Sequence, residues 1–308
     1  MSDPGVKTFW GGFPWNRFAA FIAPGADRFA LLKSLTEEAG LNAVVIPIGE
    51  NRHFFVFPPG QNIKAAGEFP FRGQSPVILA AHYDRVPGSP GANDNSAAVF
   101  QLLLAAGKLG EQNTGNWIII FTDKEELLAG EGIQDQGSFG LAEKLKRWGL
   151  GKARVFIFDA CGTGDTLIVS STTGYFLKND ERPGLRKTLR LVRNLQDQAL
   201  KTARQLRMDK VLLIPTPFSD DAGFLRAGIP AQTITALPAG EAAPYAGALR
   251  KHPDLAERLI SGALRESAGR LLIPETWRVI NSSADSPLRL TPETYSRVIR
   301  FAAELCRE

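Results

Sequence analysis

The sequence predicts an α/β protein of three layers, in which a mixed, mostly parallel sheet carries helices on both faces. Apolar runs recur along the chain without polar alternation, and helical segments separate them. Uninterrupted runs are typical of strands buried on both faces, and their alternation with helices is typical of parallel sheets. Acidic residues and a histidine follow several of these runs, at the edge where open sheets of this class bind ligands.

The expected elements follow one another along the whole chain. The N-terminal part is predicted to form a helix at 27–39 and strands at 42–48 and 52–58. The remaining elements are predicted in this order: strand 76–81, helix 95–109, strand 117–122, helix 138–148, strands 154–158 and 167–171, helix 184–207, strands 211–214 and 231–235, and helix 292–306. No repeat, low-complexity tract or linker interrupts them. A single domain over residues 1–308 is therefore predicted, with residues 1–70 packing on its core as an N-terminal helix and strands.

The composition is that of an ordinary globular protein. Of the 308 residues, 44% are hydrophobic and 22% are charged, which is enough apolar material for a sizeable core. Two cysteines, Cys161 and Cys306, are too few for a disulfide framework and suit a reducing compartment. No apolar run reaches the roughly 18 residues of a membrane span, and the apolar stretch 18–26 is broken by Pro24, unlike a signal peptide. A cytoplasmic protein without a membrane partner is expected.

The net charge of +4 gives little support to a polyanionic partner. The helix predicted at 184–207 could be interpreted as a nucleic-acid-binding face, because it carries seven cations: Arg186, Lys187, Arg190, Arg193, Lys201, Arg204 and Arg207. No aromatic residues are interleaved with these charges to stack on bases, and charge runs on amphipathic helices are usually solvated. No nucleic-acid partner is expected, and the oligomeric state is left open.

Six side chains that can bind metal ions follow the predicted strands: His82, Asp84, Asp94, Glu125, Glu126 and Asp159. Taken singly, each has an ordinary structural explanation, because an acid before a helix, for example, is commonly an N-cap. Five carboxylates gathered at one edge of a sheet would repel one another and have raised pKa values unless a cation were present. Their coincidence therefore predicts a divalent metal site.

The residue types suit zinc, which binds imidazole nitrogen and carboxylate oxygen. Residues i and i+2 of an extended chain project to the same side, so Asp84 can accept the second ring N–H of His82 and fix its tautomer. Asp94 could bridge two ions about 3.5–4 Å apart. Of the adjacent Glu125 and Glu126, one could bind metal while the other acts as general base.

Five blocks of the sequence resemble one known family. They are VILAAHYDRVPGSPGANDNSAA, IIIFTDKEE, VFIFDACGTGD, PFSDDAGFLRAGIPA and VINSSADSP, and they span roughly residues 75–305. In order and spacing they are similar to the co-catalytic zinc aminopeptidases related to glutamate carboxypeptidase II and glutaminyl cyclase. The resemblance implies a zinc exopeptidase-like fold and a metal-dependent hydrolase that removes N-terminal residues from peptides.

The resemblance also implies which residues bind the metal. His82, Asp94 and Asp159 would hold a first zinc ion. Asp94 would bridge to a second ion, and Glu126 would be the next ligand of that ion. The peptide bond between Asp94 and Asn95 is implied to be cis.

Two further residues receive roles from the resemblance. Glu125 would be the general base that takes a proton from the attacking water and passes it to the leaving amine. Asp84 would orient His82. An aminopeptidase also needs a partner for the free amine of its substrate, a peptide or aminoacyl compound, and Asp165 is one candidate.

One position departs from the family pattern. Where the last block of the family supplies a histidine to the second metal, this chain has Asn281. An amide oxygen suits magnesium, calcium or manganese better than zinc. The second site could therefore be weak and leave one zinc ion, hold a different divalent metal, or belong to a protein that has lost catalysis. The family often has a Gly-Ser turn soon after the glutamate that corresponds to Glu126. Here Gly137 and Ser138 come farther along the chain, which predicts an inserted loop lining the cleft.

Other interpretations have less support. A binding protein on a former peptidase fold is the alternative to an enzyme, because of Asn281. An aminoacyl cyclase on this fold would need the histidine that is absent. Ser219 has no histidine partner and no G-x-S-x-G setting, so it is expected in the wall of the binding pocket. Cys161 is expected to pack as a buried free thiol.

Overall fold

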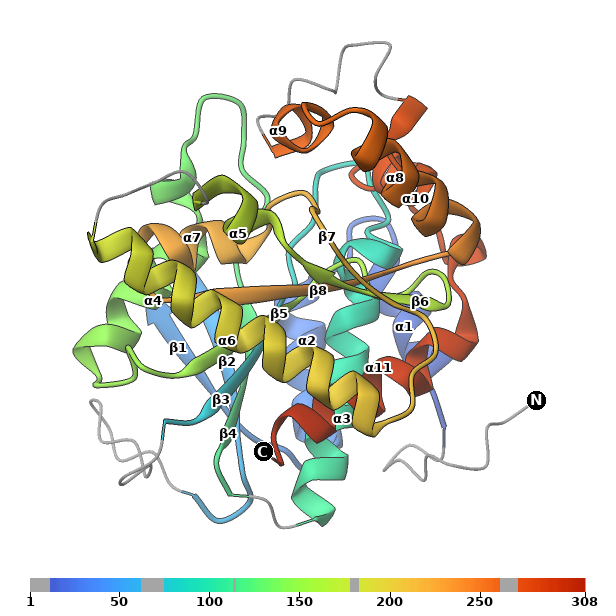
Figure 1. The fold of residues 1–308 in the computed structure, drawn as a ribbon. Coiled ribbons are helices and arrows are strands. Elements are labelled where there is room, and N and C mark those ends of the chain that lie inside the picture. The colour runs from blue at the N-terminus through green and yellow to red at the C-terminus, as the bar shows by residue number, and fades with distance from the viewer. Residues whose placement is uncertain (1–11, 62–74, 113–114, 178–182, 261–270, 308) are drawn as a thin grey trace.

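Eight strands form one sheet in the part of the chain that this computed structural model describes, residues 12–61, 75–112, 115–177, 183–260 and 271–307 (Figure 1). The spatial order of the strands is β1-β2-β4-β3-β5-β8-β6-β7. Their bounds are β1 (Asn42–Ile48), β2 (Asn51–Phe57), β3 (Val77–His82), β4 (Trp117–Thr122), β5 (Arg154–Phe158), β6 (Thr166–Ser170), β7 (Val211–Ile214) and β8 (Ala231–Leu237).

The middle of the sheet is parallel, and antiparallel pairs join its margins to it. β3 pairs in parallel with β4 and β5, and β5 pairs in parallel with β8. The β1–β2 hairpin extends the sheet beyond β4, and β6 runs antiparallel to β8. This arrangement confirms the predicted mixed, mostly parallel sheet. His82 at the end of β3 lies opposite Thr122 at the end of β4, so the carboxyl ends of the two strands are level.

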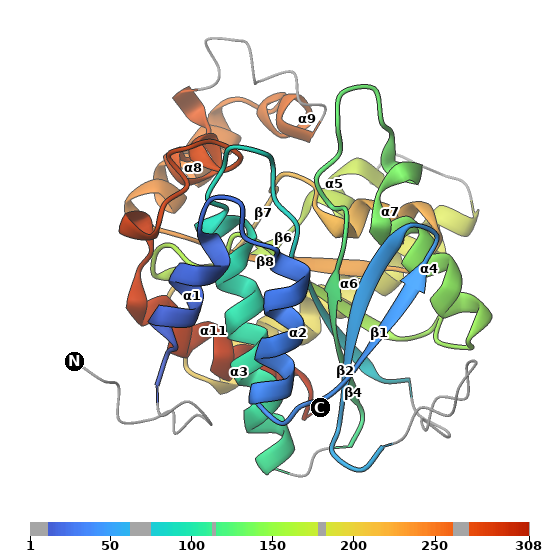
Figure 2. The same cartoon turned by 180° about the vertical axis from the view of Figure 1, so that it is seen from behind.

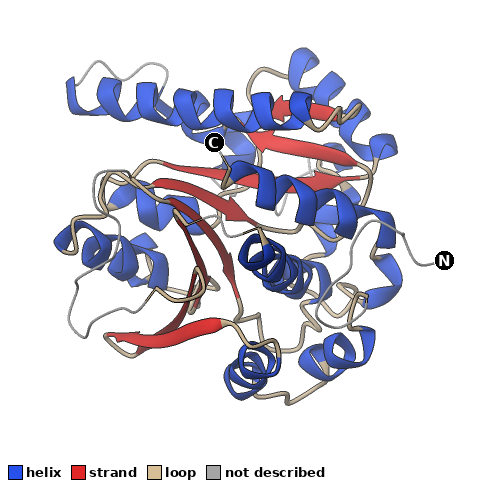
Figure 3. Ribbon diagram, turned by 90° about the horizontal axis from the view of Figure 1, so that it is seen from below, coloured by secondary structure: helices blue, strands red, loops and turns tan. Residues whose placement is uncertain are grey.

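Helices cover both faces of the sheet (Figure 3), as the sequence predicts. The face toward the viewer of Figure 2 carries α1, α2 and α3, and α6 and α11 belong to the same core. These helices are α1 (Trp15–Ile22), α2 (Arg28–Glu38), α3 (Ala97–Glu111), α6 (Pro183–Gln205) and α11 (Pro292–Leu305). The helices α4, α7, α8, α9 and α10 pack in two cores on the opposite face. Their bounds are α4 (Gly137–Arg147), α7 (Asp220–Arg226), α8 (Ala239–Lys251), α9 (Leu255–Ile260) and α10 (Glu275–Val279), and α5 (Thr172–Leu177) follows β6.

Alternate residues of the central strands enter different cores. On β3, Leu79 packs in the core that contains α3, whereas Ile78 packs in the core that contains α4. Every residue of β3 and β4 is buried, which explains why these runs lack the polar alternation of a half-exposed strand. The ionisable side chains that belong to β3, to β4 or to the loops after them therefore lie at the carboxyl ends of these strands or just beyond them.

The long predicted elements agree with the structure to within a few residues, whereas several short helices were not predicted. The unpredicted elements are α1, α5, α7, α8, α9 and α10. Most have five to eight residues, too few for the 3.6-residue periodicity to emerge. The longer α8 contains Pro244, which breaks the helical pattern in the sequence.

The N-terminal part contributes more helix than expected. The apolar stretch near residue 18 forms α1, and its Phe18 and Phe21 are fully buried against α3. Residues 1–11 and 62–70 of the predicted N-terminal segment lie outside the described residues. Among the described helices, none has both the length and the hydropathy that crossing a bilayer requires.

Candidate metal centre

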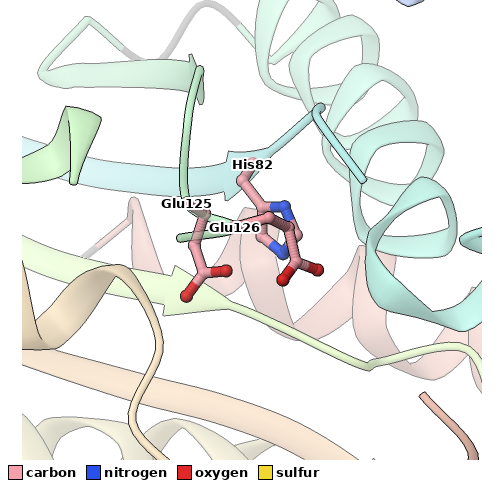
Figure 4. Close-up of side chains that lie close together, drawn as sticks. All are labelled: His82, Glu125 and Glu126. Carbon is pink, nitrogen blue, oxygen red and sulfur yellow. The ribbon is translucent and has the colours of Figure 1, made fainter. Parts of the chain in front are cut away.

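Three neighbouring strands bring four ionisable side chains to one edge of the sheet. His82 is the last residue of β3, and Asp159 directly follows β5. Glu125 and Glu126 lie just past β4, and their carboxylates approach the His82 ring (Figure 4). Because β4, β3 and β5 are adjacent and parallel, residues that are far apart in sequence meet at this edge.

Asp94 reaches the same place from the loop between β3 and α3. The carboxylate of Asp285 accepts the backbone N–H of Asn93 at 2.9 Å and that of Asp94 at 3.1 Å. The side-chain amide of Asn95 donates to the carbonyl of Phe158 at 2.8 Å. The peptide bond between Asp94 and Asn95 is cis, as the resemblance implies. The loop is thus fixed on both sides of Asp94.

The His82 ring lies among carboxylates. Its Nε2 is 3.0 Å from Asp94 Oδ1 and 3.8 Å from Asp159 Oδ1, and its Nδ1 is 3.4 Å from Asp84 Oδ1. Neither ring nitrogen makes an aligned hydrogen bond with a described residue, although the ring is completely buried. A buried imidazole without aligned partners has nitrogens free to bind a metal ion.

Asp84 links the ends of two strands beneath this ring. Its two carboxylate oxygens accept the backbone N–H groups of Glu125 at 3.1 Å and Glu126 at 3.0 Å. Burial opposes its charge, but His82 and these backbone N–H groups hold the pKa of Asp84 below its usual value. An ionised Asp84 next to Nδ1 favours a proton on that nitrogen and leaves the lone pair of Nε2 available to a ligand.

Burial and mutual repulsion raise the pKa values of the other acids. Burial first, and then the charge of Asp94, raise the pKa of Glu126 to about 8. Burial also raises the pKa of Glu125 well above its usual range, and burial with the charge of Asp159 raises the pKa of Asp94. Burial opposes a charge on His82, yet the surrounding carboxylates raise its pKa well above the usual value. Such shifts are those of a buried anionic cluster, whose charge a bound cation would balance.

The donor set fits a divalent metal ion. The ligand atoms of His82, Asp94 and Asp159 all lie within 4.8 Å of one another, and so do those of His82, Glu125 and Glu126. Oδ1 of Asp159 and Oε1 of Glu126 are buried and have no hydrogen-bond partner among the described residues. One imidazole nitrogen with carboxylate oxygens is a typical ligand set for zinc.

A cavity of about 600 Å³ opens onto this cluster. Its acidic members are Asp94, Glu125, Glu126 and Asp159, and no Lys, Arg or His lines it among the described residues. Its apolar walls are formed by Val86, Leu127, Ile133, Phe218, Ile260, Trp277 and Ile280. The size is within the range of small-molecule sites.

Two predictions about the cavity wall are confirmed, and one candidate is wrong. Ser219 lines the cavity, and so does the loop after Glu126 through Leu127 and Ile133. Asp165, the candidate partner for a substrate amine, does not line the cavity. It forms an ion pair with Lys210, so its charge is already balanced elsewhere on the surface.

Sequence reasoning missed three residues that hold the centre in place. Asp285 belongs to the block VINSSADSP but received no role. Gln136 donates from Nε2 to Glu125 Oε1 at 3.1 Å, and its own Oε1 accepts the N–H of Gly223 at 3.1 Å. Arg28 lies in α2, far from every motif. Only the position of Asp285 inside a recognised block could have identified one of these residues from the sequence.

Arg28 anchors the loop that carries Asp84 and Asp94. Its guanidinium is buried and donates to acceptors at both ends of that loop: the carbonyls of Tyr83, Asp84, Pro90 and Gly91 at 3.0–3.1 Å and the Ser96 hydroxyl at 2.6 Å. Gly91, with φ of 61°, lets the chain pass closely, because a Cβ there would lie 2.8 Å from the guanidinium. The helix α2 is thereby connected directly to the loop that carries two acids of the candidate metal centre.

We expect Arg28→Met to destabilise the metal-free protein by about 3 kcal/mol, because it leaves several buried acceptors without donors. Zinc affinity should fall by about 10–100-fold, as for other residues that position ligands. Denaturant unfolding and zinc competition titration measure the two effects. Arg226→Met, at an exposed position near the end of α7, is the control and should change neither. Zinc affinity equal to wild type in Arg28→Met would contradict the positioning role.

A mixed sheet with helices on both faces and a histidine–carboxylate cluster at its parallel edge defines the class, a zinc exopeptidase-like α/β fold. The chain belongs to Peptidase family M28, whose family model matches residues 64–258. A comparison with curated protein sequences gives no significant match.

Solved structures share the fold. BSAP, a zinc aminopeptidase from Bacillus subtilis, is 20% identical with a TM-score of 0.52, and the alignment covers 82% of this chain and 49% of that one. The LapA aminopeptidase of Legionella pneumophila is 15% identical with a TM-score of 0.59, with 95% and 69% covered. A glutaminyl cyclase from Bacteroides thetaiotaomicron is 16% identical with a TM-score of 0.59, with 96% and 94% covered. This chain thus spans about half the length of the Bacillus protein. At 15–20% identity these similarities show the fold that the chain shares with them.

Proposed function

We propose that this chain is a zinc-dependent aminopeptidase that removes N-terminal residues from peptides. The observation that carries the proposal is the cluster of His82, Asp94 and Asp159 ligand atoms within 4.8 Å, with Glu125 lining the same cavity. Family membership and the aminopeptidases among similar structures support the reaction class.

His82, Asp94 and Asp159 would hold the zinc ion, and Asp84 would orient the His82 ring through its contact with Nδ1 at 3.4 Å. Zinc, when bound in such a site, polarises the scissile carbonyl and lowers the pKa of water. The carboxylate of Glu125 would accept a proton from the attacking water and deliver it to the leaving amine. The hydrogen bond from Gln136 to Glu125 Oε1, at 3.1 Å, holds that carboxylate at the cavity wall.

The charge of the cavity favours the amino end of a peptide over its carboxyl end. Four carboxylates line it, and no described cation does. When the carboxylates are ionised, one divalent ion leaves this set negative and attracts an ammonium group, and a second divalent ion makes the set neutral. In neither case does a described side-chain cation line the cavity to pair with a substrate carboxylate. The apolar walls, which include Phe218 and Trp277, favour an apolar first side chain.

A panel of dipeptides and aminoacyl amides tests the proposal. We expect hydrolysis of substrates with a free amine and little change in kcat/KM on C-terminal amidation. N-acetylation should lower kcat/KM by about 100-fold or more, because it leaves the polar groups that would bind the free amine without a partner. Release of the C-terminal residue of a tripeptide ahead of its N-terminal residue, or faster turnover of acetylated substrates, would contradict the assignment. Ring closure of N-terminal glutamine without peptide hydrolysis would identify a cyclase, and no turnover of any substrate would favour a binding protein.

A further inference from the structure

Asn281 stands where the family resemblance implies a ligand of a second metal ion. Oδ1 of Asn281 and Oε1 of Glu126 are both buried and have no hydrogen-bond partner among the described residues. Both residues line the same cavity as Asp94, whose side chain is 5% exposed. Two unpartnered oxygens therefore belong to residues that line the same cavity as the carboxylate that a second ion would share with the first.

These three residues do not fit a second zinc ion. All of their available donors, the carboxylates of Asp94 and Glu126 and the amide oxygen of Asn281, are oxygens. Zinc sites are typically completed by imidazole or thiolate, and oxygen-only sets suit manganese, magnesium or calcium. A ring nitrogen of His82 also lies within 4.8 Å of Glu125 and Glu126 oxygens. Its Nε2 is 3.0 Å from Asp94 and 3.8 Å from Asp159, and we assign it to the position that those two carboxylates share.

We propose that the chain carries a mixed-metal centre, with zinc held by His82, Asp94 and Asp159 and a hard divalent cation held by Asp94, Glu126 and Asn281. A buried amide oxygen without a donor is unfavourable, and a cation bound there removes that cost. This inference rests on the zinc site of the proposed function. It goes further by assigning the two positions to ions of different chemical class.

The backbone at Asn281 determines which variants are informative. Asn281 has φ of 62°, in the left-handed region that Asn, Asp and His adopt more readily than other side chains. Asn281→His supplies the missing nitrogen, and Asn281→Asp keeps the oxygen and adds charge, both without new backbone strain. Asn194→His, at an exposed position on α6, controls for the addition of a histidine.

The test uses the full chain loaded with zinc and dialysed against metal-free buffer. Elemental mass spectrometry counts retained zinc, and the loss of the free Mn²⁺ electron paramagnetic resonance signal measures manganese binding. We expect wild type to retain about one zinc ion per chain and to bind about one Mn²⁺ without losing that zinc. Asn281→His should retain about two zinc ions and bind Mn²⁺ about tenfold more weakly or worse, whereas Asn281→Asp should bind Mn²⁺ more tightly and still retain one zinc.

Several outcomes would overturn the mixed-metal centre. Wild type that retains two zinc ions, or binds Mn²⁺ only by displacing zinc, would contradict it. So would unchanged zinc and manganese binding in both Asn281 variants, or the same gain of zinc in Asn194→His. One retained zinc with no Mn²⁺ binding would overturn this inference and leave the proposed aminopeptidase intact. The absence of any retained zinc would instead contradict the proposed function itself.

Discussion

Asp94→Asn is expected to abolish peptide hydrolysis and to lower zinc affinity by more than about 100-fold. Asp94 Oδ1 lies 3.0 Å from His82 Nε2, and the side chain is almost fully buried, so its charge acts at short range on any ion beside that ring. The amide of asparagine keeps the shape and removes the charge. Loss of zinc would then remove the group that, in the proposed function, would polarise the substrate carbonyl.

Without metal, the Asp94→Asn substitution should not weaken the protein: it should leave the stability of the fold unchanged or raise it. Burial and the neighbouring Asp159 charge raise the pKa of Asp94, so an ionised Asp94 is unfavourable in the folded state without metal. We expect metal-free Asp94→Asn to be at least as stable as metal-free wild type. Zinc at about 1,000 times the wild-type Kd should stabilise the wild type by about 4 kcal/mol and the variant by at most about 1.4 kcal/mol.

Thermal unfolding with and without zinc measures this difference. Asp209→Asn, at an exposed position between α6 and β7, is the matched control and should behave as wild type in both conditions. Asp94→Asn that retains zinc and turnover, or that unfolds without metal at a much lower temperature than wild type, would show that Asp94 is a structural residue and not a metal ligand.

Glu125→Gln is expected to reduce kcat by about 10²–10⁴-fold, the usual contribution of a general base. Zinc content should not change, because Glu125 is assigned to proton transfer and not to the metal. Glutamine keeps an oxygen that can accept the hydrogen bond from Gln136, which wild type forms at 3.1 Å. The variant therefore removes the base with little disturbance of the cavity wall.

The neighbouring acid provides the decisive comparison. Both Glu125 and Glu126 lie near His82 (Figure 4), so their roles could be exchanged. In Glu125→Gln, steady-state rates should show loss of turnover while elemental analysis shows full zinc content. In Glu126→Gln, the electron paramagnetic resonance signal of free Mn²⁺ should show loss of Mn²⁺ binding. Glu50→Gln, at the exposed turn between β1 and β2, should match wild type. Wild-type turnover in Glu125→Gln would remove it from the role of base.

The central strands and the edge of the sheet where the acids lie could be predicted from the sequence. β3, β4 and β5 are buried along almost their whole length, so each appears as an uninterrupted apolar run. Parallel pairing then brings their carboxyl ends to one edge, and His82 and Asp159 lie there for that reason. The prediction relied on a general rule of sheet topology and on local hydrophobicity.

The residues that fix the loop around Asp94 could not be predicted in the same way. Arg28 donates mainly to backbone carbonyls, and such contacts leave no complementary side chain in the sequence to suggest the pairing. Asp285 accepts from backbone N–H groups nearly 200 residues away in the chain. Asp165 was a wrong candidate because its partner Lys210 is close in space and distant in sequence.

Zinc content and aminopeptidase rate measured on the same sample test the central claim most directly. The protein is stripped with a chelator, zinc is restored in steps, and each step is assayed by elemental mass spectrometry and by hydrolysis of a free-amine substrate. The account predicts a rate that rises in proportion to bound zinc until the site formed by His82, Asp94 and Asp159 is full. A rate that is independent of zinc, or a fully zinc-loaded protein that hydrolyses no peptide with or without added Mn²⁺, would contradict it.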